Sequence, residues 1–103
     1  MMKPLLRLGI SAMCALSAVP SLADPTLARS YAATCAGCHG TNGVAKAPMV
    51  ALAGMSKDNI VTQMKAFKEG KRPATIMHQL AKGYTDQQIE LIADFFSRQK
   101  PAR

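Results

Sequence analysis

Two cysteines and a histidine are spaced for a single piece of chemistry. The segment Cys35-Ala-Gly-Cys38-His39 places two thiols three residues apart and an imidazole directly after them. On one helical turn, such thiols can add to the two vinyl groups on one edge of a porphyrin while the imidazole faces the iron. This C-x-x-C-H spacing is typical of covalent c-type haem attachment. The motif therefore predicts one haem c attached to Cys35 and Cys38, with His39 as the proximal iron ligand.

Other roles for the motif fit the rest of the sequence less well. Structural zinc sites favour paired Cys/His clusters, yet only His78 and scattered carboxylates are available beyond the motif. A thiol oxidoreductase places its C-x-x-C after a strand in a βαβ unit, and no segment alternates as a strand does. A disulfide across two residues would close too small a loop to stabilise the chain, and it would leave His39 without a role. Haem attachment is the favoured interpretation.

The sixth coordination position of the iron determines what such a haem does. The ligand candidates are Met49, Met55, Met64, Met77 and His78. Met49 and Met55 follow His39 too closely to reach the opposite haem face easily. Met64 falls on the apolar stripe of an expected helix, where methionine more often fills the core. Met77 is preceded by ample chain to wrap the porphyrin, so it is the preferred ligand. His78 is the alternative, because adjacent helical residues point about 100° apart and cannot both face the iron.

The start of the chain predicts an export signal over residues 1–23, cleaved from the mature protein. Lys3 and Arg7 precede an uncharged stretch that ends before the small-residue site Ser21-Leu22-Ala23. That stretch is well short of the roughly 20 residues that cross a bilayer, which disfavours a permanent membrane helix. Cys14 then belongs to the discarded leader. The expected location is the periplasm.

Composition limits what the remaining residues 24–103 can be. The whole chain has 103 residues and a formal net charge of +7, with its charges scattered. Scattered charge and appreciable hydrophobicity exclude a disordered tail, and no cationic block reaches the density of a nucleic-acid-binding arm. A domain of about 80 residues seldom stabilises itself through its apolar core alone. A covalently bound group would supply the missing stability.

Helices joined by loops account for the whole of this domain. The patterns predict a first helix from Pro25 that carries the motif at its end, and a loop over residues 40–54. A second helix is expected over 57–69, a short one over 73–81, and a last one after the capping box Thr85-Asp-Gln-Gln88. Apolar stripes on the second and last helices would face a core. The predicted fold is all-α, with about four helices around one haem.

Longer stretches resemble a known family. They are Cys35-Ala-Gly-Cys38-His39-Gly-Thr-Asn-Gly43, the segment Met64-Lys-Ala-Phe-Lys-Glu-Gly-Lys-Arg72-Pro-Ala-Thr-Ile-Met77, and Ala81-Lys-Gly-Tyr84. The sequence resembles class I cytochromes c, in particular the cytochrome subunit of flavocytochrome c sulfide dehydrogenases and related free monohaem cytochromes. The resemblance implies Cys35 and Cys38 for attachment, His39 and Met77 as iron ligands, and terminal helices that cross over the haem.

The loop after the motif departs from this family. Relatives usually have a proline two residues before the Leu-Ala-Gly of the loop, and its carbonyl accepts a hydrogen bond from the proximal imidazole. Here Val50 or Ala51 occupies that place, and Pro48 is the nearest proline. Such bonds tune ligand basicity and the reduction potential. Which carbonyl orients His39 stays open at this point.

The resemblance implies a periplasmic electron carrier without substrate chemistry of its own, because the haem supplies the redox chemistry. Electrons would come from a flavoprotein sulfide dehydrogenase, with the chain as its cytochrome subunit. The alternatives are a free soluble carrier serving other dehydrogenases or oxidases, and a haem-based sensor with an open sixth position. No nucleic acid and no permanent membrane span are expected.

A run of positive charge precedes and follows Met77. Its members are Lys57, Lys65, Lys68, Lys71, Arg72 and Lys82. Surface lysines are often no more than a solvated helix face. Near a haem rim, however, they would steer an acidic redox partner toward it. Arg72 could in addition pair with a haem propionate.

Overall fold

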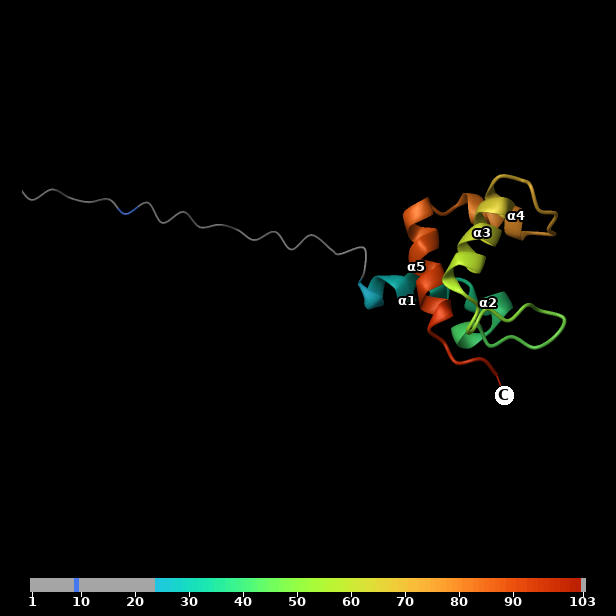
Figure 1. The fold of residues 1–103 in the computed structure, drawn as a ribbon, viewed down its shortest axis with the longest axis horizontal. Helices are drawn as coiled ribbons and strands as arrows, with labels where there is room; N and C mark the ends of the chain where they lie inside the picture. The colour runs from blue at the N-terminus through green and yellow to red at the C-terminus, as the bar shows by residue number, and fades with distance from the viewer. Residues whose placement is uncertain (1–8, 10–23, 103) are drawn as a thin grey trace, which may run out of the picture.

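The computed structural model describes residue 9 and residues 24–102, so the predicted export segment lies almost entirely outside the described residues (Figure 1). The described part contains five α-helices and one 3-10 helix, and no strand. They are α1 (Pro25–Ala33), α2 (Ala36–His39), η1 (Thr41–Gly43), α3 (Lys57–Lys68), α4 (Met77–Lys82) and α5 (Asp86–Ser97). This arrangement confirms the predicted all-α fold.

The first and last of these helices form one half of the core. Asp24 caps α1 by accepting a hydrogen bond from the backbone N–H of Thr26 at 2.8 Å, and Pro25 occupies its first turn. Figure 1 shows α1 running across α5, against which it packs. The apolar stripe of α5 is almost completely buried, as its spacing predicts; its members are Ile89, Ile92, Ala93 and Phe96.

The second half of the core comes from α3. Ser56 caps this helix through a hydrogen bond from the backbone N–H of Asn59 at 3.2 Å. Ile60 and Met64 are buried on its inner face, and Phe67 packs against the same cluster. The helix packs on α5 on one side and on α4 on the other. These contacts leave one face of α3 and α4 to line the site described below.

Two helix boundaries differ from the sequence-based expectation. The first helix ends at Ala33, and the motif forms a separate short helix, because the Thr34 hydroxyl donates to the Tyr31 carbonyl at 2.8 Å and ends the regular pattern. The short helix begins at Met77 and not at Pro73. Ile76 has φ −140° and ψ −25°, which is not helical. Its β-branched side chain and that of Thr75 lower the local helix propensity.

The capping box of α5 is present as predicted, and it allows a stability test. Gln88 N–H donates to Thr85 Oγ1 at 3.2 Å, and Thr85 N–H donates to Gln88 Oε1 at 2.9 Å. We expect Thr85→Ala to lower the free energy of unfolding by about 0.5–2 kcal/mol, because it removes a cap. Denaturant unfolding measures this loss. Thr62→Ala, on the exposed face of α3, is the control; an equal loss in both variants would contradict the role of the cap.

No helix in the described part of the chain is long and apolar enough to span a bilayer.

Candidate haem site

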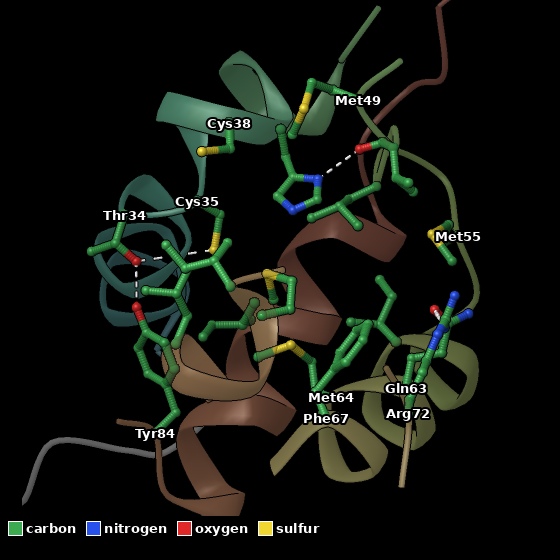
Figure 2. A pocket seen from close by; sticks show the side chains of 18 of the residues that line it. Thr34, Cys35, Cys38, Met49, Met55, Gln63, Met64, Phe67, Arg72 and Tyr84 are labelled. Carbon is green, nitrogen blue, oxygen red and sulfur yellow. Dashed lines mark hydrogen bonds between the residues drawn. The ribbon is translucent and has the colours of Figure 1, made fainter. Parts of the chain in front are cut away.

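A cavity of about 310 Å³ lies between α2, the loop after it, α3 and α4 (Figure 2). Its walls bring together the residues that the sequence singled out: Cys35, Cys38, His39 and Met77. Most of the remaining wall is apolar, with contributions from Leu52, Ile60, Phe67 and Ile92. Residues far apart in the sequence thus line one largely apolar cavity together with the residues of the motif.

The two cysteines lie together on one side of this cavity (Figure 2). Cys35 precedes the first turn of α2, where its carbonyl accepts hydrogen bonds from the backbone N–H groups of Cys38 and His39 at 3.3 and 2.9 Å. This single turn presents both thiols and the imidazole to the same cavity. Cys38 is exposed, while Cys35 is half-buried. Burial raises the pKa of the Cys35 thiol, and a hydrogen bond to Thr34 partly opposes that effect.

The imidazole of His39 is oriented by a backbone carbonyl. Its Nδ1 lies 2.6 Å from the carbonyl oxygen of Val50. A carbonyl only accepts hydrogen bonds, so Nδ1 carries the proton and donates it. The other ring nitrogen, Nε2, is then left with the lone pair that a metal ligand needs. The question left open by the missing proline is thereby answered: Val50, and not Pro48 or Ala51, provides the acceptor.

Gly43 holds the loop that supplies this carbonyl. The backbone N–H groups of Leu52 and Ala53 donate to the Gly43 carbonyl at 2.8 and 3.1 Å. Gly43 has φ +78°, and a Cβ there would lie 2.7 Å from a ring carbon of Phe96 and 2.9 Å from the Ala53 nitrogen. Only glycine fits, on both conformational and steric grounds. The close approach fixes the loop against α5 and so places the Val50 carbonyl.

Methionines surround the cavity. All four in residues 24–102 line it: Met49, Met55, Met64 and Met77. Met64 is only 7% exposed and belongs to the core cluster, as its place on the apolar stripe of α3 predicts. Met77 is the first residue of α4 and is half-buried. His78, the alternative ligand, is not among the residues that line the cavity.

These residues fit a haem better than a simple metal ion. Two thiols share one edge, a ring nitrogen is free to bind iron, and a thioether is available from α4. None of the described polar or charged side chains is buried. Within the described residues there is no group of three or more His, Cys, Asp or Glu side chains that could hold a metal ion.

The sequence predicted only some of the polar side chains at the cavity wall. Arg72 lines the cavity, as does Gln63, whose amide oxygen accepts a hydrogen bond from it. Tyr84 donates to the Thr34 hydroxyl at 2.6 Å, since that hydroxyl already donates to its own helix. Arg72 was identified from its charge and from the Arg-Pro segment that resembles the family. Gln63 and Thr34 lie outside every motif, and the contact of Tyr84 with Thr34 depends on tertiary packing.

The predicted positive run is largely engaged in other contacts. Lys57 pairs with Glu90 at 3.4 Å and Lys71 with Glu69 at 2.8 Å. Lys68 donates to the Tyr84 carbonyl at 2.7 Å and also lies 3.5 Å from Asp86. Of the six cations, only Arg72 lines the cavity. The run therefore does not form one free cationic face, because several of its side chains bind acidic side chains or carbonyls that the fold brings near them.

Comparisons with known proteins place the chain among cytochromes. Residues 23–96 match the family model described as cytochrome C oxidase, cbb3-type, subunit III. The chain is 44% identical over 63 residues to the cytochrome subunit of sulfide dehydrogenase from Chlorobaculum tepidum, an alignment that covers 61% of this chain and 57% of that protein. It is 37% identical over 71 residues to cytochrome c-554(548) from Halomonas halodenitrificans, which covers 65% of this chain and 86% of the relative.

A third relative is cytochrome c4 from Pseudomonas aeruginosa, which is 36% identical over 78 residues, covering 75% of this chain and 39% of that protein. The chain thus spans a little over half of the Chlorobaculum subunit and less than half of cytochrome c4. The named relatives are cytochromes or cytochrome subunits, which supports the interpretation as an electron-transfer protein. Because the family model covers residues 23–96, most of the chain, the chain belongs to the cytochrome c family of the cbb3-type oxidase subunit III model.

Proposed function

We propose that the protein is an exported single-electron carrier that holds one haem c. The observation that carries the proposal is the cavity that brings Cys35, Cys38, His39 and Met77 onto a common, largely apolar space. Thioether bonds from the two cysteines would hold the haem, and His39 and Met77 would be its iron ligands. When bound, the haem supplies a ferric/ferrous couple.

The residues around the cavity would set the reduction potential of that couple. The Val50 carbonyl holds the His39 ring by accepting a hydrogen bond from Nδ1–H, which would raise the basicity of Nε2 as a ligand. The Met77 thioether favours the ferrous state and raises the potential, whereas His78 in its place would lower it. We favour Met77 because it lines the cavity and His78 does not. The apolar walls from α3 and α5 limit access of water to the site.

Arg72 is the residue that we assign to a haem propionate. It lies across the cavity from the two cysteines (Figure 2). The vinyl groups and the propionates occupy different edges of a haem, so cysteines on one side leave the propionates for the other. A guanidinium there can form charge-assisted, bidentate hydrogen bonds to a carboxylate.

The physiological donor that we propose is a flavoprotein sulfide dehydrogenase, on the basis of the similarity to the Chlorobaculum subunit. Purification of the exported protein with its partners, followed by spectra before and after sulfide addition, tests this. Reduction only in the presence of a flavoprotein would identify the donor. Reduction by many unrelated dehydrogenases would favour a free carrier, for which the small cytochrome from Halomonas is a precedent in size.

We propose a periplasmic location because of the leader-like residues 1–23. Mass spectrometry of the protein from a periplasmic fraction should find a chain that begins at Asp24. Recovery of the uncleaved chain from the cytoplasm would contradict the location.

Docking is the basis of a further prediction. Four exposed apolar side chains line the cavity: Met49, Val50, Ile76 and Leu80. We propose that a partner contacts this rim and that Lys65 and Lys82 steer it, since neither has an ion-pair partner among the described residues. The second-order rate of electron transfer should fall steeply as salt rises through ~0.1 M, where screening reaches about 10 Å. Stopped-flow kinetics with the physiological partner measures this.

Two double variants distinguish electrostatic steering of the partner by Lys65 and Lys82 from an effect of the overall net charge. Lys65→Glu with Lys82→Glu should slow the reaction at low salt. Arg29→Glu with Arg98→Glu makes the same change of charge beside a different surface groove, between α1 and α5. Equal effects of the two double variants, or a rate that does not depend on salt, would reject a docking role for Lys65 and Lys82.

A further inference from the structure

Gln63 and Arg72 form a hydrogen-bonded pair on the wall of the cavity (Figure 2). Gln63 lies in α3, and Arg72 lies in the loop that follows this helix. The Arg72 guanidinium also lies over the Phe67 ring, 4.9 Å from its centroid. An exposed arginine would ordinarily sample many rotamers, but here a hydrogen bond and a cation–π contact both restrict it.

A third residue sets the orientation of the Gln63 amide. Gln63 Nε2 donates to Asn59 Oδ1 at 2.8 Å, one helical turn earlier on α3. This contact turns the amide oxygen of Gln63 toward Arg72. The reverse orientation would place an NH₂ group against a guanidinium, and both groups are only donors. Asn59 is itself anchored at the helix start, where its backbone N–H donates to Ser56 Oγ.

The pair leaves most of the guanidinium available. Arginine has five N–H donors, and the Gln63 oxygen accepts from only one of its nitrogens, Nη1. The remaining donors can bind a carboxylate at the rim of the cavity across from Cys35 and Cys38. Gln63 and Phe67 thus hold a cation where a haem propionate would lie.

We infer that Gln63 is a positioning residue, which acts through Arg72 on a haem propionate and thereby on the reduction potential. The inference rests on the proposed haem site. A fixed cation near the haem favours the ferrous state, which carries one positive charge less than the ferric state. Loss of the cation, or of the contacts that hold it, should therefore lower the potential.

A double-mutant cycle tests this inference on the haem-loaded protein. Spectroelectrochemical titration should show that Arg72→Gln raises the ferric-to-ferrous ratio at a fixed potential by about threefold or more. Gln63→Leu should shift it in the same direction by less, and should add nothing in the Arg72→Gln background. Both variants should shift the propionate bending bands in the resonance Raman spectrum. Arg29→Gln, on α1 and away from the cavity, should change neither the ratio nor the bands.

Several results would overturn the inference. One is an equal effect of Gln63→Leu with and without Arg72, because Gln63 would then act independently; another is an unchanged Raman spectrum in both variants. If Gln63→Leu fails to bind haem, Asn59→Ala tests the same series of contacts, from Asn59 through Gln63 to Arg72, with a side chain that does not line the cavity. An unchanged potential and Raman spectrum in Asn59→Ala would reject the inference. A wild-type protein without haem would refute the proposed function itself, a separate outcome visible in the first spectrum.

Discussion

Replacement of Met77 by alanine is expected to abolish the weak charge-transfer band near ~700 nm that ferric, thioether-ligated haem shows, and to open the iron to carbon monoxide. The reason is that Met77 lines the cavity from α4, while its neighbour His78 does not. Absorption spectra of the ferric protein, and of the ferrous protein under carbon monoxide, measure both effects. Rapid carbon monoxide binding by the unaltered protein would instead indicate an open sixth position and a haem-based sensor.

Met64→Ala is the matched control for that experiment. Met64 also lines the cavity, but it is 7% exposed and packs within the core cluster. Its removal should keep the band and lower the free energy of unfolding by about 2–5 kcal/mol, as loss of a buried methionine does. A Met64→Ala protein without the band, beside a Met77→Ala protein that retains it, would reverse the assignment of the ligand. Absence of the band from the unaltered protein, together with carbon monoxide binding that only His78→Ala opens, would favour the imidazole.

Removal of either motif cysteine should leave a chain that accumulates poorly. The core of the described residues consists of a few apolar side chains from α1, α3, α4 and α5, so we expect the domain to depend on its bound haem for stability. Cys35→Ala and Cys38→Ala should therefore lose the cooperative thermal transition. Circular dichroism on the haem-free chain measures it.

Gly37→Ala serves as the control for the cysteine variants. It changes a residue between the two cysteines, and a Cβ at this position would meet nothing within 4 Å. We expect haem content and the thermal transition to be nearly unchanged. A native-like cooperative melt of the haem-free cysteine variants would contradict the dependence on haem.

Local signals in the sequence predicted most of the fold and the central site residues. The capping box at Thr85 and the apolar stripes of α3 and α5 depend on residues a few positions apart, so they can be read without tertiary information. The C-x-x-C-H motif is similarly local, and the cavity brings its three side chains together as expected. The end of the first helix at Ala33 was not predicted, because it depends on the hydrogen bond from the Thr34 hydroxyl to the Tyr31 carbonyl. No sequence pattern indicates whether a threonine hydroxyl will bond to the backbone or to solvent.

Contacts between distant segments were harder to predict. The carbonyl that orients His39 had three candidates in the loop, and the folded loop, which packs Gly43 closely on Phe96, brings the Val50 carbonyl to the ring. Lys68 looked like a docking charge, yet the fold brings the Tyr84 carbonyl within 2.7 Å of it. The contact between Gln63 and Arg72 likewise joins α3 to the chain that turns back after it. Such pairings require the tertiary structure, since no periodicity links their members.

The most direct test of the central claim is the mass of the exported protein after denaturation, together with the masses of its proteolytic peptides. We expect the mass of residues 24–103 plus one haem, with the haem remaining on the peptide that contains Cys35 and Cys38. A haem that is extracted from the denatured chain, or a mass without haem and with both thiols free, would contradict covalent attachment at this motif.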